Sequence, residues 1–162
     1  MTKVWTLKGT RPVVPAAGAN QRLCLYGAFN YRTGQVYYMN HPKKNAKRFA
    51  QFLSQLLAAN ADQFLVLVLD NATYHRTAEI LDILTQHEHH VFVVWLPKYS
   101  PELNLIEGLW GYLKTSALNN YFYGDIESLE AAVDAAFKDL QQHPETSLSL
   151  AYKTSKNLRK SA

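Results

Sequence analysis

The pattern of apolar and polar residues changes period several times along the chain, and each change predicts a new element. Residues 64–69 and 91–96 are continuous apolar runs, which are typical of short strands buried on both faces of a parallel sheet. A helix between two such strands predicts a right-handed parallel crossover. Apolar residues recur at helical spacing in residues 44–59, 77–86, a stretch that begins at 100–101, and 126–142.

The same spacing predicts which side of each helix faces the core. Ser100 is a typical N-cap residue and Pro101 a typical first helical residue, so we expect the third helix to begin there. The predicted core positions are Phe49, Phe52, Leu53, Leu56 and Leu57, then Ile80, Leu81 and Leu84, then Leu103, Ile106, Trp110 and Leu113, and finally Leu129, Val133, Phe137 and Leu140.

Before the first helix, the sequence predicts a β-hairpin. Residues 22–30 and 35–39 are rich in aromatic and β-branched side chains and flank a turn that contains Gly34, whereas residues 1–15 read as a loop. A hairpin followed by strand, helix and strand is the layout of a ribonuclease-H-like α/β domain, a mixed sheet flanked by helices. Such a domain begins with one more, central strand. We see no candidate for it, so we expect the first strand to be absent.

Composition indicates a globular protein of a reducing compartment. Apolar residues make up 48% of the 162 positions, the chain has a single cysteine, and its longest apolar run is far too short to span a bilayer. The N-terminus also lacks the pattern of a signal peptide. We therefore expect one domain over residues 1–162, a cytoplasmic location and no membrane partner.

Charge is distributed unequally along the chain. Residues 1–61 contain nine lysines and arginines and no acidic residue, whereas residues 62–162 contain eight basic and thirteen acidic residues. This division fits a nuclease-like protein, with phosphate contacts on one part and metal-binding acids on the other. An ordinary basic surface is the simpler alternative.

Asp70 is the first candidate for chemistry. It follows a strand of apolar residues, where the chain leaves the C-terminal edge of the predicted sheet and ligand sites of α/β proteins gather. A carboxylate buried there needs a cation or hydrogen bonds to compensate its lost hydration. The alternative is that Asp70 or Asn71 only shapes the turn and caps the next helix.

Glu107 is the second candidate. On the predicted helix it lies four positions after Leu103 and three before Trp110, so it shares their inward face. The alternative is a partly exposed flank residue paired with a nearby lysine. Together with Asp70, Glu107 offers the oxygen ligands that Mg²⁺ prefers, and two such ions can promote phosphodiester displacement. Two metals would ask for a third acid.

Two long sequence phrases carry a resemblance to a known family. They are LDNATYH at residues 69–75 and LPKYSPELNLIEGLWGYLK at residues 96–114, and WTLKGTRP at residues 5–12 adds a third. These phrases resemble the catalytic domain of the DDE transposases of the mariner superfamily, in its bacterial insertion-sequence branch. Leu105 stands where many relatives have proline, inside a helix that has already begun.

The resemblance implies a metal-dependent endonuclease that cleaves DNA at transposon ends and joins the freed 3′-hydroxyl to target DNA. Asp70 and Glu107 would be catalytic metal ligands for Mg²⁺ or Mn²⁺. The family's first catalytic Asp, expected several residues before Trp5, is missing, together with the N-terminal helix-turn-helix domain. We therefore expect an N-terminally truncated catalytic domain, either a fragment or a second-frame product.

The expected partners follow from the same resemblance. They are transposon-end and target DNA, and either further copies of the chain in a homo-oligomer or an upstream transposase fragment. Lys98, Lys114 and His75 are candidates for DNA contact, although His75 could equally position Asp70 or serve in capping or packing. The alternative function is a catalytically inactive DNA-binding or inhibitory remnant. Another ribonuclease-H-like nuclease is disfavoured by the long second phrase.

A histidine-rich stretch, His87-Glu88-His89-His90, also has the composition of a metal site. A helix C-terminus that runs into a loop explains it better. We find no nucleotide-binding glycine loop and no cysteine–histidine zinc spacing.

Overall fold

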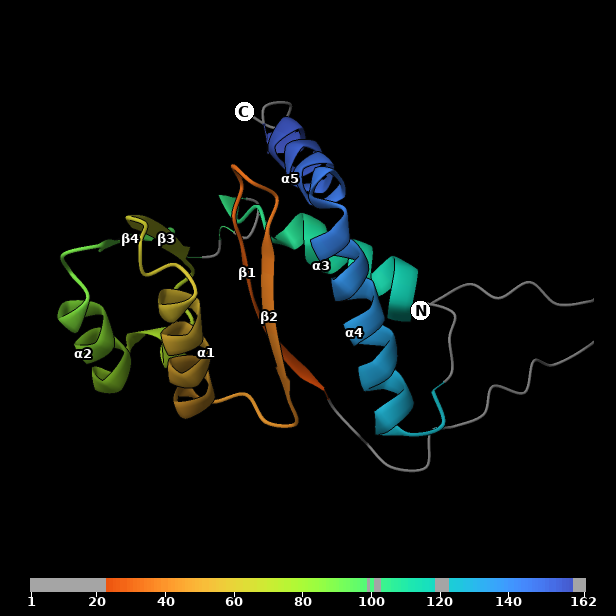
Figure 1. The fold of residues 1–162 in the computed structure, drawn as a ribbon, viewed down its shortest axis with the longest axis horizontal. Helices are drawn as coiled ribbons and strands as arrows, with labels where there is room; N and C mark the ends of the chain where they lie inside the picture. The colour runs from red at the N-terminus through yellow and green to blue at the C-terminus, as the bar shows by residue number, and fades with distance from the viewer. Residues whose placement is uncertain (1–22, 99, 101–102, 119–122, 159–162) are drawn as a thin grey trace, which may run out of the picture.

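The computed structural model describes residues 23–98, 100, 103–118 and 123–158, with side chains up to residue 153 in the last segment. The fold is mixed α/β, with a central hairpin between two groups of helices (Figure 1). The loop expected at residues 1–15 lies outside the described residues.

The predicted hairpin is confirmed. Strands β1 (Cys24–Phe29) and β2 (Val36–His41) pair antiparallel. The turn between them is held by Asn30, whose side-chain oxygen accepts the backbone N–H groups of residues 32 and 33 at 3.0 and 3.2 Å. Gly34 adopts φ 80°, a conformation that favours glycine because it carries no Cβ. The turn chemistry therefore sets the register of the hairpin.

Helix α1 (Ala46–Ala58) is confirmed with the predicted inward face. Asn45 caps it by accepting the Arg48 N–H at 2.9 Å, which satisfies one of the unpaired donors of the first turn. All five apolar residues predicted to face the core are buried. A single stripe of large side chains thus packs α1 against the hairpin.

The predicted strand–helix–strand unit is also confirmed. Strand β3 (Leu65–Leu69) pairs in parallel with β4 (Val91–Trp95), and helix α2 (Ala78–Gln86) connects them. Along α2, Ile80 is fully buried, whereas Leu81, predicted to face the core, is 45% exposed. The apolar stripe of α2 is therefore narrower than its sequence indicates.

The expectation that β3 and β4 are buried on both faces was wrong. Burial alternates along both strands, and the exposed face carries large apolar side chains. The residues on it are Val66, Val68, Phe92 and Val94. Helices α1 and α2 cover the opposite face, because residues 65, 67, 69 and 93 pack against the core that contains Phe49 and Ile80. The continuous apolar runs therefore predicted the strands correctly, but they did not predict which faces of the strands are buried.

The helix expected from Ser100 begins later. Helix α3 spans Glu107–Leu113 and continues into a π-helical segment, η3 (Lys114–Leu118). Leu113, one of the positions predicted to face the core, is buried. Leu103, another of them, is 42% exposed, because this residue precedes α3. Leu109, which the prediction omitted, is buried instead.

Helix α4 (Ile126–Gln142) has the predicted bounds and is capped by Asp125, which accepts the Ser128 N–H at 2.7 Å. Helix α5 (Pro144–Leu158) was not predicted. Its signal was a proline at the first helical position directly after the α4 C-terminus. It packs on α3, which places the C-terminal helix beside the element that carries Glu107.

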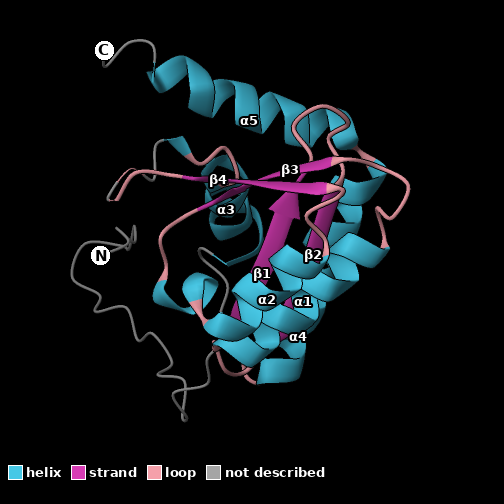
Figure 2. Ribbon diagram, turned by 90° about the vertical axis from the view of Figure 1, so that its left-hand side faces the viewer, coloured by secondary structure: helices cyan, strands magenta, loops and turns pink. Residues whose placement is uncertain are grey.

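The hairpin separates two hydrophobic cores. On one face, Tyr26 and Met39 pack with α1, α2 and β3, and on the other, Phe29 and Val36 pack with α3 and α4. Among the described residues, the strands form two separate pairs, β1–β2 and β3–β4, and Figure 2 shows the pairs running in different directions. No helix in the described part of the chain is long and apolar enough to cross a membrane.

Candidate functional site

Asp70 lies directly after β3, where the parallel strand ends. Its Oδ1 accepts the Ala72 N–H at 3.0 Å, so the carboxylate holds the turn that follows the strand. The side chain is 54% exposed. The expectation of a buried carboxylate is therefore wrong, because β3 ends at an open pocket and Asp70 keeps contact with solvent.

His75 approaches Asp70 from the 3₁₀ segment η1 (Thr73–Arg76). Its Nδ1 lies 2.8 Å from Asp70 Oδ1 and 3.3 Å from the Asp70 carbonyl oxygen. The ring is buried, with its centroid 4.1 Å from that of Phe49 and 4.3 Å from that of Tyr74. Burial lowers the pKa of His75, against the opposing effect of Asp70, which favours a neutral ring that donates from Nδ1.

The burial of His75 bears on its predicted role. With 8% of its surface exposed, the residue offers little area to a DNA phosphate. Its contacts instead match the alternative that the sequence left open, in which the imidazole positions Asp70. The aromatic side chains of Phe49 and Tyr74 hold the ring against rotation.

Glu107 is the first residue of α3 and is exposed. The expectation that it shares an inward face with Leu103 was wrong, since Leu103 precedes the helix and is itself exposed. The first turn of a helix favours a negative charge, because its backbone N–H groups have no partner within the helix and carry partial positive charge. Glu107 therefore reaches solvent from the N-terminal end of α3.

Asp70 and Glu107 line the same pocket, although 36 residues separate them in the sequence. The pocket has a volume of about 390 Å³. Asn71 closes one side of it, because its Nδ2 donates to the Leu96 carbonyl oxygen and ties the end of β3 to the end of β4. The lining residues are Asp70, Asn71, Ala72, Leu96, Pro97, Lys98, Ser100, Asn104 and Glu107.

The donor set of this pocket suits a hard cation. Among the described residues that line the pocket, two carboxylates, two side-chain amides and a hydroxyl offer oxygen atoms, and none is a thiol or an imidazole. The described residues contain no cluster of three or more His, Cys, Asp or Glu that could hold a metal ion. Mg²⁺ is commonly bound through one or two protein carboxylates, with waters and substrate phosphates as the other ligands. The residues present therefore fit such an ion.

The predicted DNA-contacting lysines occupy different places. Lys98 lines the pocket and is exposed. Lys114 is exposed at the C-terminal end of α3 and does not line it.

Lys44 is a neighbour of the site that sequence reasoning missed. Its Nζ lies 4.7 Å from the centre of the Tyr74 ring, a cation–π contact. Burial lowers the pKa of Lys44, but the contact with Tyr74 and the charges of Asp70 and Tyr26 outweigh burial, so its pKa is raised. The ammonium group therefore stays charged beside the Asp70 end of the pocket. No sequence signal separates Lys44 from the adjacent lysines.

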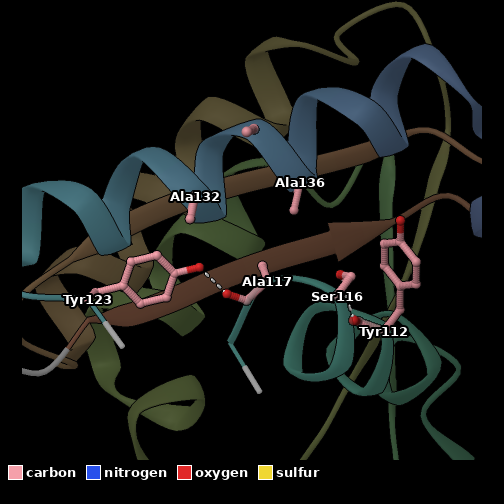
Figure 3. Close-up of a pocket in the computed structure, with 7 residues that line it drawn as sticks. Tyr112, Ser116, Ala117, Tyr123, Ala132 and Ala136 are labelled. Atoms are coloured by element: carbon pink, nitrogen blue, oxygen red, sulfur yellow. Dashed lines mark hydrogen bonds between the residues drawn. The ribbon is translucent and has the colours of Figure 1, made fainter. Parts of the chain in front are cut away.

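A second hollow lies between α4 and the α3–η3 segment (Figure 3). Its volume is about 330 Å³. Tyr123 donates to the Ala117 carbonyl oxygen at one end, and Tyr112 lies at the other. The residues that line it are Tyr112, Ser116, Ala117, Tyr123, Ala132, Ala135 and Ala136. No carboxylate or imidazole is among these described lining residues.

The histidine-rich stretch lies at the C-terminal end of α2, as expected for a helix end. His87 Nδ1 contacts the Ile83 carbonyl oxygen at 2.8 Å, and His90 Nδ1 contacts His89 Nε2 at 2.9 Å. Burial and the two neighbouring imidazoles lower the pKa of His90. His87 thus satisfies one helix carbonyl and His89 contacts His90, whereas His90 Nε2 is buried without a hydrogen-bond partner among the described residues.

The α/β fold thus places two carboxylates on one open pocket beyond the end of a parallel strand. The family model for the DDE superfamily endonuclease matches residues 1–130, so the chain belongs to that family. This match confirms the resemblance that the two sequence phrases carry.

Two other proteins are similar to this chain in sequence. The insertion element IS630 uncharacterized 39 kDa protein of Shigella sonnei is 29% identical over 118 residues, which are 72% of this chain and 34% of that protein. The uncharacterized protein y4pE/y4sA of Sinorhizobium fredii (strain NBRC 101917 / NGR234) is 29% identical over 79 residues, 49% of this chain and 55% of that protein. The chain thus spans between a third and just over half the length of these relatives.

Solved structures with a similar fold include three complexes of Mos1. The Mos1 strand transfer complex superposes with a TM-score of 0.63 at 19% identity, over 94% of this chain and 49% of that one. The Mos1 transposase paired-end complex with left transposon end gives 0.59 at 18%, over 93% and 50%. The Mos1 mariner paired end complex with Mn gives 0.54 at 20%, over 94% and 50%. These likenesses support the fold.

Proposed function

We propose that this chain is the catalytic part of a DDE-type transposase that cleaves DNA at transposon ends and transfers the cut strand to target DNA. The observation that carries the proposal is the meeting of Asp70 and Glu107 on one pocket. Both acids stand in the sequence phrases that resemble the family, and the fold now brings those phrases together. The Mos1 complexes of similar fold support transposon-end and target DNA as the partners.

Mg²⁺ or Mn²⁺ is the proposed cofactor, held by Asp70 and Glu107. When bound, such an ion activates the attacking oxygen and stabilises the leaving oxygen in phosphodiester hydrolysis. The protein's own part is to orient the two carboxylates. His75 and the Ala72 N–H fix Oδ1 of Asp70, which would leave Oδ2 as the proposed ligand atom. Lys98 would contact a DNA phosphate at the rim, and Lys114 would do so further along α3.

We further propose a ribonuclease-H-like, single-domain arrangement in which one more strand lies between the two strand pairs and carries the third carboxylate. The separation of the described strands into β1–β2 and β3–β4 supports this proposal. Residues 1–61 contain no acidic residue. The third carboxylate would therefore come from upstream sequence or from a separate polypeptide, and further copies of the chain would form a homo-oligomer around the DNA.

The experiment measures Mn²⁺ binding by calorimetry and metal-dependent nicking of plasmid DNA, for the chain alone and for the chain extended by its upstream reading frames. We expect Asp70→Asn and Glu107→Gln each to weaken Mn²⁺ binding and to abolish nicking by whichever form is active. Glu79→Gln is the matched control, because it removes an exposed acid at the start of α2, outside the pocket lining. Unchanged nicking by either pocket variant would refute the proposal. DNA binding without nicking in every form would instead support an inactive, DNA-binding remnant.

A further inference from the structure

A concentration of positive charge lies where the chain enters α1. Four of the six residues from 43 to 48 are basic, and we call these four residues, Lys43, Lys44, Lys47 and Arg48, the α1 basic surface. The three lysines are exposed, whereas Arg48 is partly buried and donates from Nη1 to the Gln51 side chain at 2.9 Å. The backbone bend before α1 is held by His41, whose Nδ1 accepts the Lys43 N–H at 3.0 Å.

Within the described part of the chain, no carboxylate is paired with this charge. The sequence has no acidic residue before Asp62, and the first turn of α1 has none. None of the four basic side chains forms an ion pair with a carboxylate of the described residues. The N-terminal end of the α1 dipole adds further positive potential. An uncompensated field of this kind attracts a polyanion, and its largest effect is on a phosphate backbone.

A chain of contacts joins this surface to the reaction pocket. Lys44 lies over the Tyr74 ring, and Tyr74 packs edge-on against the rings of Phe49 and His75 at 5.7 and 4.3 Å. His75 in turn contacts the Asp70 carboxylate at 2.8 Å. The direction of the Lys44 side chain is therefore set by the same aromatic group that holds the metal-ligand candidate. The charge of Asp70 is among the causes that raise the pKa of Lys44.

We propose that the α1 basic surface binds the DNA backbone beside the Asp70 end of the pocket, with Lys44 as the member of this surface nearest to the Asp70 carboxylate. The proposal rests on the proposed function in taking DNA as the substrate. It adds a second phosphate-binding region to that of Lys98, on a different element. Binding there depends on charge and not on base identity, so it holds DNA of any sequence.

The experiment measures the affinity of the full chain for a short, fluorescently labelled DNA duplex of mixed sequence, in EDTA, over a range of salt concentrations. The test pair is Lys43→Gln with Lys47→Gln. The matched pair is Lys138→Gln with Lys153→Gln, which removes the same charge from exposed positions on α4 and α5, across the hairpin from α1 (Figure 1). Circular dichroism of each variant checks that the fold is intact.

We expect the test pair to weaken binding and to reduce the slope of log affinity against log salt by about 2, since each phosphate that a lysine no longer neutralises lowers the slope by about 1. The matched pair should change the slope by much less. Lys44→Gln should reduce the slope by about 1, and Lys44→Arg should restore it, because arginine also binds a phosphate and stacks on Tyr74. A slope unchanged by the test pair, an equal change in the matched pair, or no binding by the native chain at low salt would each overturn the proposal.

Because binding is measured in EDTA, failure of this proposal can be distinguished from failure of the proposed function. Binding without metal does not depend on Asp70 or Glu107 acting as ligands. If the test pair leaves the slope of log affinity against log salt unchanged while metal-dependent nicking is intact, only the proposal for the α1 basic surface is rejected. If Asp70→Asn nicks DNA as the native chain does, while the test pair changes the salt slope as expected, only the catalytic assignment is rejected.

Discussion

His75 Nδ1 lies 2.8 Å from Asp70 Oδ1, in a contact that joins a buried imidazole to a half-exposed carboxylate. The ring cannot follow the carboxylate into solvent, because Phe49 and Tyr74 pack against it. Asp70, which lines the pocket, is therefore held from the protein side through Oδ1. A carboxylate fixed in this way would suit the role of metal ligand that we propose for it, because its orientation is set before the ion binds.

The first prediction concerns this contact. His75→Leu should raise the Mn²⁺ concentration needed for half-maximal binding by about 10- to 100-fold, the usual effect of removing a group that orients a metal ligand. His75→Asn should lose less affinity, because its side-chain amide can still donate to Asp70. Calorimetric titration of both variants checks this. Equal affinities in the two variants would indicate that His75 serves only in packing.

Gly27 and Trp110 give the second prediction. A Cβ on Gly27 would lie 2.6 Å from Trp110 Cη2 and 3.1 Å from Cζ2, so the indole covers the strand where a side chain would stand. Gly27→Ala should lower the free energy of unfolding by about 1–3 kcal/mol, because the ring must move. Trp110 lies in α3 with Glu107, so metal binding should weaken too.

Gly111 is the control for Gly27. It lies in α3, and a Cβ there would meet no atom within 4 Å. Gly111→Ala should raise the free energy of unfolding by about 0.4–1 kcal/mol, since alanine restricts the unfolded chain and favours a helix. Urea denaturation measures both variants. Destabilisation by Gly111→Ala would contradict the open position of this glycine.

The third prediction contrasts two leucines that the sequence places equally in the core. Leu53 is 1% exposed and Leu103 is 42% exposed. Leu53→Ala should lower the free energy of unfolding by about 2–5 kcal/mol, because it leaves a cavity between α1 and the hairpin. Leu103→Ala should change it by less than about 0.5 kcal/mol. Comparable losses in the two variants would place Leu103 in the core after all.

The fourth prediction concerns the pH dependence of the α4 cap. Hydrogen bonding to Ser128 lowers the pKa of Asp125 below its ordinary value of 3.8. The ionised cap therefore stabilises the folded state fully above about pH 4 and loses this effect as the pH falls through the lowered pKa. Asp125→Asn keeps an acceptor for the Ser128 N–H but does not titrate.

Thermal melts followed by circular dichroism test this cap. Between about pH 5 and pH 2, the melting temperature of the native chain should fall further than that of Asp125→Asn. Asp125→Ala should melt below both at neutral pH, because the N–H is left without its partner. Parallel pH profiles for the native chain and Asp125→Asn would count against an ionised cap.

The sequence by itself determined the order and type of most elements and the family of the protein. Periodicity located α1, α2 and α4 and both strand pairs, because helix and strand spacing is a local property of the chain. Residues 69–75 and 96–114 carried the resemblance to the DDE transposases, since their residue types are unusual in combination. Asp70 and Glu107 stood out for the same reason.

Only the tertiary structure decided what surrounds these residues. Apolar runs at β3 and β4 could not show that one face of each is exposed, because burial depends on which elements lie opposite. Leu103 and Glu107 were misplaced because α3 begins at Glu107, beyond the predicted start. The contact between His75 and Asp70, the neighbourhood of Lys44 and Tyr74, and the pocket shared by Asp70 and Glu107 all depend on residues that the chain's local pattern does not place together. Packing alone brings such residues into contact.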